Sequence, residues 1–564
     1  MPSAGRRTRL DQLLPFGYIG AALLLAVILL PSALRPPLQQ PDQSGAFSPN
    51  APPNKNQTLY AGAHAADSGT FGGTQAGSGP GGSTPSTLPP PPQQQGNQYS
   101  ACPYGVGNPP RQIASVYAPP CAPAFTGNNG GATSPGVTAN TINICYLMNL
   151  TGADSSGGPI PQQETSSEGG VARTYTVLMN YFNSRYQFYG RKMQWYYVSN
   201  PSGSNSTANA YARADAAKNT YHCFASIEET NADELDELAH DGIIAYTLAQ
   251  VPESYFQSKD PYIWSFTPSA TSTIKMGVEY YCKKLAGKPP TYTNDPTFNY
   301  KAPRKVGLIV YDLPEYGNMS GYATSLLRQE CGVTPAKVVT YDLTGSGSGT
   351  QGLSTDVVQL RAAGVTTVFY LGDLLSAAIF TEAAYSNNYY PEWYLPGFGG
   401  VDTGHIGRDY NGYEWVHAFG YSFYEVPRPD EETECYQAYH QIDPNNDPDS
   451  GMCNYMWGDM VQLFGGIQEA GPHLTPQKFR QALINQPKLP PDPPWHMAGG
   501  YADDNHTFPL WAAEIWWDPN SLGSDGQPGT YRYLNNGQRY TFGGWPSGDD
   551  PGLFHSGITM APGS

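Results

Sequence analysis

From residue 137 onward, the sequence alternates short apolar runs with longer amphipathic stretches, and this alternation constrains the fold more than any other feature. Apolar runs of about four to eight residues are typical of buried strands, and the stretches between them are long enough for helices. We expect strands at 141–148, 193–198, 223–227 and 243–247, and helices at 168–189, 207–221 and near 232–240. Short buried strands separated by helices predict a parallel sheet.

A second series of the same kind follows Pro268. We expect helices at 273–285, 316–331, 354–363 and 375–386, and strands at 305–311, 337–341, 366–371 and 392–396. Helices near 432–442, 454–470 and 476–485 and a strand near 511–517 then precede a Gly-rich tail. The sequence therefore predicts an α/β protein with two doubly wound, Rossmann-like lobes, and the late elements must return to complete one or both of them.

The N-terminal segment, residues 1–35, reads as an export signal. Three arginines, at 6, 7 and 9, precede an uncharged stretch from Gln12 to Leu34. At about 1.5 Å per residue this stretch can span the hydrocarbon core of a bilayer, ~30 Å thick. We expect a single-pass membrane anchor with all that follows Arg35 outside the cytoplasm. Cleavage of the segment, which would leave a secreted protein, is the alternative.

A change of composition separates the anchor from the folded part. Residues 36–100 hold 12 Pro, 10 Gly and only three charged side chains, which predicts a disordered linker that cannot bury a core. Residues 101–136 look like a short segment, closed by a disulfide, that leads into the folded lobes; we call it the lead-in segment. We assign residues 137–268 with about 425–510 to lobe 1, and residues 269–424 with about 511–555 to lobe 2.

The chain has eight cysteines, which in an exported protein are disulfide candidates. They are Cys102, Cys121, Cys145, Cys223, Cys282, Cys331, Cys435 and Cys453. We expect Cys102 to pair with Cys121 and Cys435 with Cys453, then Cys145 with Cys223 and Cys282 with Cys331, although the sequence does not fix the connectivity. Their spacing lacks the Cys-x-x-Cys and paired-His patterns of zinc sites, so no metal is expected.

Four segments follow one another in a characteristic order: Pro-Gly-Val-Thr-Ala-Asn-Thr-Ile-Asn-Ile-Cys-Tyr-Leu-Met-Asn-Leu-Thr-Gly at 135–152, Pro-Tyr-Ile-Trp-Ser-Phe-Thr-Pro at 261–268, Val-Gly-Leu-Ile-Val-Tyr-Asp-Leu-Pro-Glu-Tyr-Gly at 306–317 and Leu-Arg-Ala-Ala-Gly-Val-Thr-Thr-Val-Phe-Tyr-Leu-Gly at 360–372. Together they resemble the type I periplasmic binding proteins, in particular the leucine/isoleucine/valine-binding branch that serves ABC importers. The resemblance covers about residues 137–520. It implies two lobes that close over a small solute.

Loops after the strands are the candidate ligand-binding residues, because ligands of open α/β sheets lie beyond the carboxyl ends of the strands. Hydroxyls, backbone N–H groups at helix N-termini and aromatic walls suit a small polar solute. The candidates are Thr151, Gly152, Glu229, Thr230, Asn231, Thr247, Leu248, Ala249, Tyr316, Gly372, Asp373 and Phe398. For each of them a helix cap or a turn is the competing structural explanation.

One position departs from the resemblance. In amino-acid binders of this family, an acidic residue of the second lobe receives the ammonium group of the ligand. The corresponding loop reads Pro-Gly-Phe-Gly-Gly-Val-Asp at 396–402 and places Phe398 and Gly399 there. Asp373, Asp402 or an acidic residue at 228–229 could substitute, and an amide, a polyol or an aromatic solute stays open as the ligand.

Two other motifs carry little weight. Glycines at 347, 349 and 352 imitate a dinucleotide fingerprint, but they lie in a Ser/Gly-rich connection deep in the second lobe of an exported chain. Residues 443–451 place oxygen ligands at alternate positions, but Pro448 replaces the glycine of an EF-hand. We therefore expect no cofactor, and the absence of a local catalytic pattern argues against an enzyme.

The sequence thus predicts an extracytoplasmic solute-binding protein that captures a small polar solute by hinge closure and presents it to an ABC permease. The alternative is a membrane-tethered ectodomain of the same fold that senses a ligand or binds a protein without transport. A net charge of −17 makes nucleic acid an improbable partner.

Overall fold

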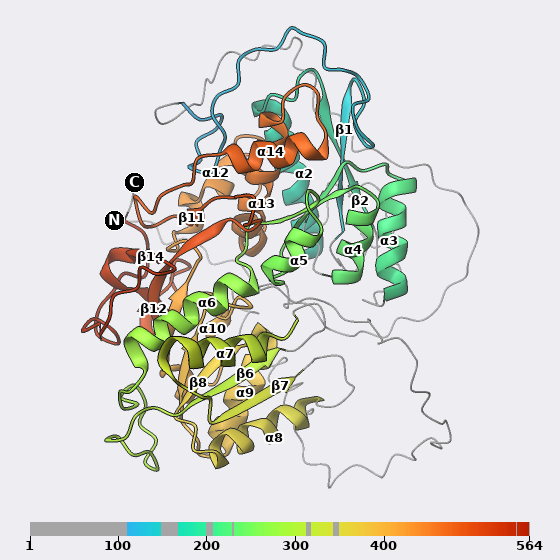
Figure 1. Ribbon diagram of the computed structural model, residues 1–564. Helices are drawn as coiled ribbons and strands as arrows, with labels where there is room; N and C mark the ends of the chain where they lie inside the picture. Colours follow the sequence, from blue (N-terminus) through green and yellow to red (C-terminus); the bar gives the residue numbers. More distant parts are fainter. Residues whose placement is uncertain are drawn as a thin grey trace, which may run out of the picture. The chain divides into compact units, whose positions relative to one another are not determined.

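The computed structural model describes residues 110–147, 167–198, 207–227, 231–311, 317–341, 349–548 and 550–562 (Figure 1). The predicted anchor and linker lie outside these residues and stay predictions. Within the described part of the chain, every helix falls short of the length or the apolarity needed to cross a bilayer.

The first sheet is entirely parallel, with strand order β2-β1-β3-β4-β5. Its strands are β1 (Thr141–Tyr146), β2 (Lys192–Tyr197), β3 (Ala225–Ile227), β4 (Ile244–Thr247) and β5 (Ile263–Ser265). The helices between them are α2 (Ser167–Arg185), α3 (Thr207–Asn219), α4 (Ala232–His240) and α5 (Glu253–Ser258). Strands β3, β4 and β5 are buried along their whole length, and this burial explains why the segments of β3 and β4 read as apolar runs.

The second sheet has the order β11-β12-β10-β9-β8-β6-β7, and β13 and β14 also pair with β12. Its parallel strands are β6 (Val306–Tyr311), β7 (Lys337–Tyr341), β8 (Thr367–Leu371), β9 (Glu392–Leu395) and β10 (Ala418–Ser422). The antiparallel strands are β11 (Ala498–Gly499), β12 (Pro509–Leu522), β13 (Pro528–Tyr533) and β14 (Arg539–Thr541). This sheet is therefore mixed, and the late strands complete it in an antiparallel orientation that the sequence pattern left open.

Helices alternate along the chain with the parallel strands of the second sheet. They are α6 (Ala270–Tyr280), which continues as a π-helix over Tyr281–Leu285, α7 (Met319–Cys331), α8 (Gly349–Ala362), α9 (Leu374–Ser386) and the short α10 (Gly404–Gly407) and α11 (Gly412–Trp415). A short 3₁₀-helix, Leu534–Gly537, joins β13 to β14. Glycines 349 and 352, two of the three in the dinucleotide-like motif, lie in the first turn of α8.

Three later helices pack beside the first sheet, although they follow β10 of the second sheet in the chain (Figure 1). After a 3₁₀ turn at Asp430–Glu432 they are α12 (Glu434–His440), α13 (Ser450–Glu469) and α14 (Pro476–Asn485). Helices α12 and α13 contact α2, and α14 contacts α13. The chain therefore passes between the lobes three times: after β5, after β10, and between α14 and β12.

Three disulfides are present between predicted partners: Cys145–Cys223, Cys282–Cys331 and Cys435–Cys453. Cys121 is also disulfide-bonded, and its predicted partner, Cys102, lies outside the described residues. The first bridge joins β1 to the start of β3, and the second joins the π-helix to the end of α7. These pairings confirm the expected use of the cysteines in the described part of the chain.

Most predicted elements are present, with shifted ends. The helix expected at 168–189 ends at Arg185, because Tyr189 and Gly190 both have positive φ and turn the chain into β2. The structure adds α5, β5, β10, β13 and β14, none of which the apolar pattern indicated.

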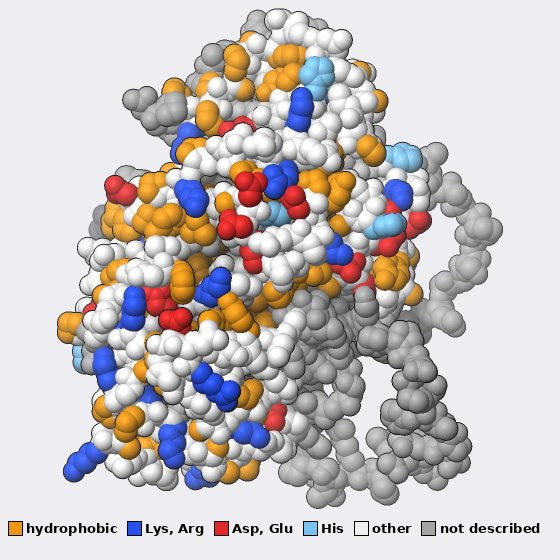
Figure 2. Space-filling view, viewed as in Figure 1, with side chains coloured by type: hydrophobic (Ala, Val, Ile, Leu, Met, Phe, Trp, Pro, Cys, Tyr) orange, Lys and Arg blue, Asp and Glu red, His pale blue; other side chains and the backbone are white. Residues whose placement is uncertain are grey.

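Lys and Arg side chains on the face in Figure 2 lie scattered among acidic and apolar side chains rather than gathered in one field.

Candidate functional site

The carboxyl edges of the two sheets meet at one hydrogen bond. Gln250 follows β4 of the first sheet, and Gly399 follows β9 of the second. The backbone N–H of Gly399 donates to Oε1 of Gln250 at 2.7 Å. The loops that the strand order predicts as ligand-binding therefore lie against each other across the lobes.

On the first lobe, the loop after β4 is fixed by hydroxyl groups. The N–H of Ala249 donates to Oγ1 of Thr247 at 3.0 Å, and the hydroxyl of Ser265 donates to the carbonyl of Thr247 at 2.7 Å. Thr267 donates to the carbonyl of Leu248 at 3.3 Å. The predicted residues Thr247, Leu248 and Ala249 are thus buried and held in place by the chain that leaves β5.

Asn231 lies at the N-terminus of α4, on the same edge of the first sheet. Its side-chain oxygen accepts from the N–H of Glu234 at 3.2 Å, and the residue is buried. This is the helix-cap role that competes with ligand binding at such positions.

On the second lobe, Asp373 caps α9. The N–H groups of Leu375 and Ser376 each donate to its Oδ1 at 2.9 Å, and the hydroxyl of Tyr341 donates to its Oδ2 at 2.6 Å. Both carboxylate oxygens therefore have protein donors, and Asp373 is 1% exposed. Gly372 precedes it, and its carbonyl lies against Gly399 so closely that a Cβ at Gly399 would stand 2.4 Å from that oxygen.

The loop after β9 carries the remaining candidates. Phe398 is fully buried in the core of the second lobe, and Gly399 has a φ of +66°, which only glycine adopts without strain. Asp402 is 2% exposed, and neither of its carboxylate oxygens has a hydrogen-bond partner among the described residues. Burial raises the pKa of Asp402 to about 6, and the hydroxyl of Ser422 lies close enough to oppose this shift without meeting hydrogen-bond geometry.

Five predicted residues lie outside the described part of the chain: Thr151, Gly152, Glu229, Thr230 and Tyr316. Each follows the carboxyl end of β1, β3 or β6. Their participation in a site stays a prediction.

Sequence reasoning missed Gln250, which is 2% exposed. Its Oε1 accepts from the opposite lobe, while its Nε2 has no hydrogen-bond partner among the described residues. A buried amide donor without a partner costs about 1–3 kcal/mol, which a bound acceptor would recover. Its signal in the sequence was only its place, one residue beyond the predicted Ala249.

Arg213 and Glu234 form a buried ion pair at the same edge of the first lobe. Nη2 of Arg213 lies 2.7 Å from Oε2 of Glu234, and its Nη1 donates to the carbonyl of Leu147, the residue after β1. Burial raises the pKa of Glu234 to about 7, which the arginine opposes. The spacing of the buried residues of α3, at 210, 213, 214 and 217, places the arginine on the inner face and could have revealed it.

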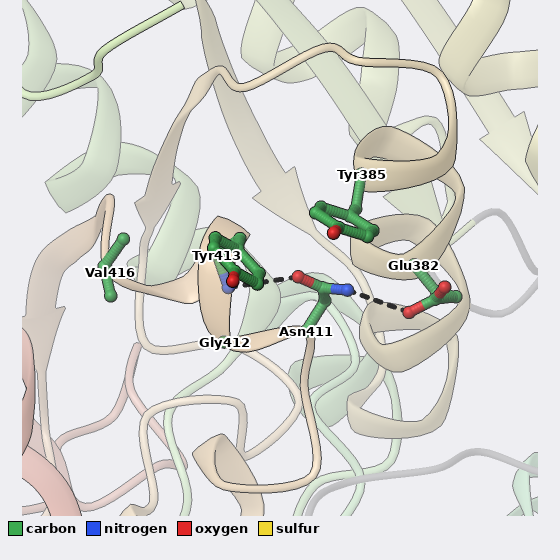
Figure 3. Close-up of a pocket in the computed structure, with 6 residues that line it drawn as sticks. All are labelled: Glu382, Tyr385, Asn411, Gly412, Tyr413 and Val416. Carbon is green, nitrogen blue, oxygen red and sulfur yellow. Dashed lines mark hydrogen bonds between the residues drawn. The ribbon is translucent and has the colours of Figure 1, made fainter.

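Two other features lie away from this junction. A pocket of about 530 Å³ is lined by Glu382, Tyr385, Asn411, Gly412, Tyr413 and Val416 (Figure 3). It lies beside the amino ends of β9 and β10, the edge opposite to Gly399. Its two tyrosine rings stack on each other at 5.1 Å.

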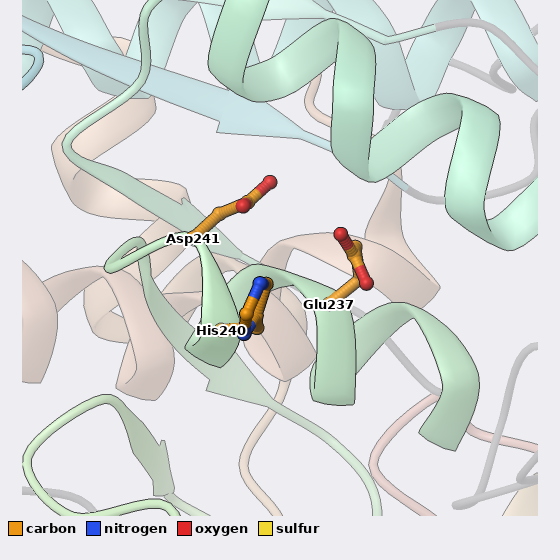
Figure 4. A group of neighbouring side chains, drawn as sticks. All are labelled: Glu237, His240 and Asp241. Carbon is orange, nitrogen blue, oxygen red and sulfur yellow. The ribbon is translucent and has the colours of Figure 1, made fainter.

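The second feature is a group of ligand-type side chains, Glu237, His240 and Asp241, at the end of α4 (Figure 4). The ammonium group of Lys218 pairs with Asp241. A positive charge therefore already neutralises the carboxylate that a cation would need.

No family model matches the chain, and a search of curated proteins finds no match. Among solved structures, the substrate-binding protein of an ABC transporter from Aeropyrum pernix aligns with a TM-score of 0.50 at 13% identity, over 72% of this chain and 96% of its own. A solute-binding protein of an ABC transporter from Rhodopseudomonas palustris BisB5, in complex with 3,4-dihydroxybenzoic acid, aligns at 0.49, with 11% identity over 73% and 99%. The branched-chain amino acid transporter substrate-binding protein LivJ from Streptococcus pneumoniae, in complex with isoleucine, aligns at 0.47, with 11% identity over 70% and 100%.

At such identities the similarity is one of fold. It confirms the expected resemblance at that level: the chain has the α/β fold of the substrate-binding proteins of ABC transporters, known as the type I periplasmic binding fold.

Proposed function

We propose that this protein is an extracytoplasmic solute-binding protein, which captures a small polar solute at the junction of its lobes and presents it to an ABC permease. The observation that carries the proposal is the hydrogen bond from Gly399 to Gln250, which joins the carboxyl edges of the two sheets. Solute would bind one lobe first, and hinge closure would bury its polar groups against fixed donors and acceptors. Residues 1–35 would hold the protein at the membrane.

The chemistry around the junction favours a solute with a hydrogen-bond acceptor. The free Nε2 of Gln250 offers a donor in a buried position. Asp402 adds a carboxyl group that would be stabilised in its charged form by a cationic group of the solute. An amino acid fits both groups, because its carboxylate accepts and its ammonium group is cationic, whereas a simple amine would use only the carboxyl group of Asp402. An aromatic acid of the kind bound by the Rhodopseudomonas palustris protein would use only the donor.

The experiment is a thermal-shift screen of the full chain, purified oxidised, against amino acids, amides, polyols, sugars and aromatic acids. A solute that binds only the folded state at a hundredfold excess over its Kd stabilises the protein by about 2.7 kcal/mol, so a binder raises the Tm. We expect Gln250→Ala to weaken the hit by about tenfold or more, because the truncation removes a buried hydrogen-bonding group. Gln481→Ala, at an exposed glutamine of α14, is the matched control and should bind like the parent chain.

Asp402→Asn then assigns the solute class. Loss of binding with this variant indicates a cationic group on the solute, and unchanged binding indicates a neutral or anionic one. A panel without any hit, on folded protein whose junction is shown to be empty, would contradict solute capture and favour the sensing or protein-binding alternative.

A further inference from the structure

Residues 110–122 of the lead-in segment are bound to the first lobe as a closed loop. Its ends approach each other at the bridge between Arg111 and Pro120. The side chain of Gln112 donates to the carbonyl of Arg185 at the end of α2, at 2.6 Å. Gln468 of α13 donates to the carbonyl of Pro120 at 3.1 Å. The segment that continues from the linker is therefore part of the folded lobe.

At the tip of this loop, Tyr117 reaches all three connections between the lobes. Its ring packs edge-on against Phe266, in the connection after β5, at a centroid distance of 5.3 Å. Its hydroxyl contacts the carboxylate of Glu425, in the connection after β10. The N–H of Met497 donates to the same hydroxyl at 2.8 Å, and the ring of Phe508 lies 5.9 Å away, both in the connection that leads to β12.

The hydroxyl of Tyr117 is the donor to Glu425 because it keeps its proton. Tyr117 is 6% exposed, and burial together with the neighbouring carboxylates of Glu425 and Glu434 raises its pKa well above the ordinary value. A buried hydroxyl that accepts a hydrogen bond from one connection and donates one to another holds the two connections in a fixed position relative to each other.

From the second lobe, Arg539 of β14 ties two of the same connections. Its guanidinium donates to the carbonyls of Phe423 and Tyr424 after β10 and to the carbonyl of Pro494 before β12. The connection after β5 is outside this set of bonds. It is bonded to the third connection directly, since the N–H of Phe508 donates to the carbonyl of Ser265 at 3.0 Å and the rings of Phe266 and Phe508 stack at 4.8 Å. Tyr117 adds a side chain that touches all three connections at one point.

We propose that Tyr117 is a hinge pin: the lead-in segment inserts it between the three interlobe connections and so sets the range over which the lobes move. The inference deepens the proposed function and rests on its hinge closure. The segment that follows the predicted linker would then limit how far the lobes move when solute binds and leaves.

The test measures the distance between lobes without any solute, so its result is independent of the solute screen. Tyr211→Cys on α3 and Val358→Cys on α8 place spin labels at two exposed positions, one on each lobe. Pulsed electron paramagnetic resonance then gives the distance distribution in the full-length, oxidised chain. With Tyr117 present we expect one narrow distribution.

Tyr117→Ala should widen this distribution by about twofold or add a second distance, since an unpinned hinge samples more than one arrangement. Tyr117→Phe keeps the ring contacts and loses both hydroxyl bonds, so we expect a smaller widening. Tyr189→Phe is the control, because the Tyr189 hydroxyl donates to Gln468 at 2.7 Å within the first lobe, away from the connections.

Distributions that stay unchanged in both Tyr117 variants would overturn the pin. If the alanine variant does not fold, as judged by circular dichroism, the phenylalanine variant alone decides. A widened distribution together with an empty solute screen would keep the pin and reject the proposed cargo, whereas a solute hit with unchanged distributions would do the reverse.

Discussion

Glu414 carries a buried carboxyl group whose negative charge opposes folding. The indole N–H of Trp393 donates to its Oε2 at 3.0 Å, and the residue is fully buried. Burial raises its pKa from 4.5 to about 8. Because the folded state holds the proton more tightly than the unfolded chain, the stabilisation is complete below about pH 4.5 and is lost as the pH rises through about 8.

Glu414→Gln imitates the protonated acid. We expect little change in Tm at pH 5 and a clear increase at pH 9, where the parent chain must bury a charge at a cost on the order of 5 kcal/mol. Thermal denaturation at the two pH values measures this. Glu330→Gln, at an exposed position of α7, is the control. An equal gain at both pH values, or the same gain with the control, would contradict the account.

At the scale of elements, two disulfides of the first lobe close loops of very different length. The sequence separation is 78 for Cys145–Cys223 and 18 for Cys435–Cys453. All four cysteines are at most 2% exposed, so their replacement by alanine leaves similar cavities. The comparison therefore isolates the effect of loop length.

If each bridge acts by restricting the unfolded chain, removing the longer loop should cost about 1 kcal/mol more than removing the shorter one. Chemical denaturation of Cys145→Ala/Cys223→Ala and of Cys435→Ala/Cys453→Ala gives the two free energies of unfolding. A larger loss for the short loop would show that native contacts of α12 and α13, rather than loop closure, dominate the stabilisation.

The sequence predicts those helices and strands whose own residues show the periodic alternation of apolar and polar side chains. The limits expected for α4, β7 and α14 agree with the structure residue for residue, because each is a periodic run bounded by a cap or a turn. Strand β10 was missed because Gly420 interrupts it, and a Cβ there would collide with the carbonyl of Leu395 in the next strand. The shortest strands, β5 and β14, have only three residues each and depend on their neighbours for pairing.

In the candidate site, too, features with a local sequence pattern could be predicted, and features that depend on distant partners could not. Strand order, which the sequence pattern predicts, places Thr247 to Ala249 in the loop after β4, where they are buried, and their part in ligand binding stays a prediction. The partnership of Gln250 with Gly399 joins residues 149 positions apart, and no local pattern encodes it. For Asp373, the same Asp that could bind a ligand is an ordinary helix cap, and only its hydrogen bonds distinguish the two roles.

At the scale of the whole molecule, the mixed second sheet shows how the late elements return, which the sequence pattern left open. Strand β12 pairs with β10 in antiparallel orientation, with Ile515 opposite Gly420, and β13 and β14 both pair with β12. These strands arrive only after the chain has returned to the first lobe to build α12, α13 and α14. The third connection between the lobes is a consequence of this path, and it supplies one side of the Tyr117 contact.

The central claim is that solute binding closes the two lobes over the junction at Gln250. The most direct test is the distance between labels at Tyr211→Cys and Val358→Cys, measured by single-molecule fluorescence transfer while the solute identified by thermal shift is added. The account predicts that the distance shortens as the solute saturates the protein, and that Gln250→Ala shifts this change to about tenfold higher solute concentration. A solute that binds with the expected stabilisation but leaves the distance unchanged would contradict closure as the mechanism.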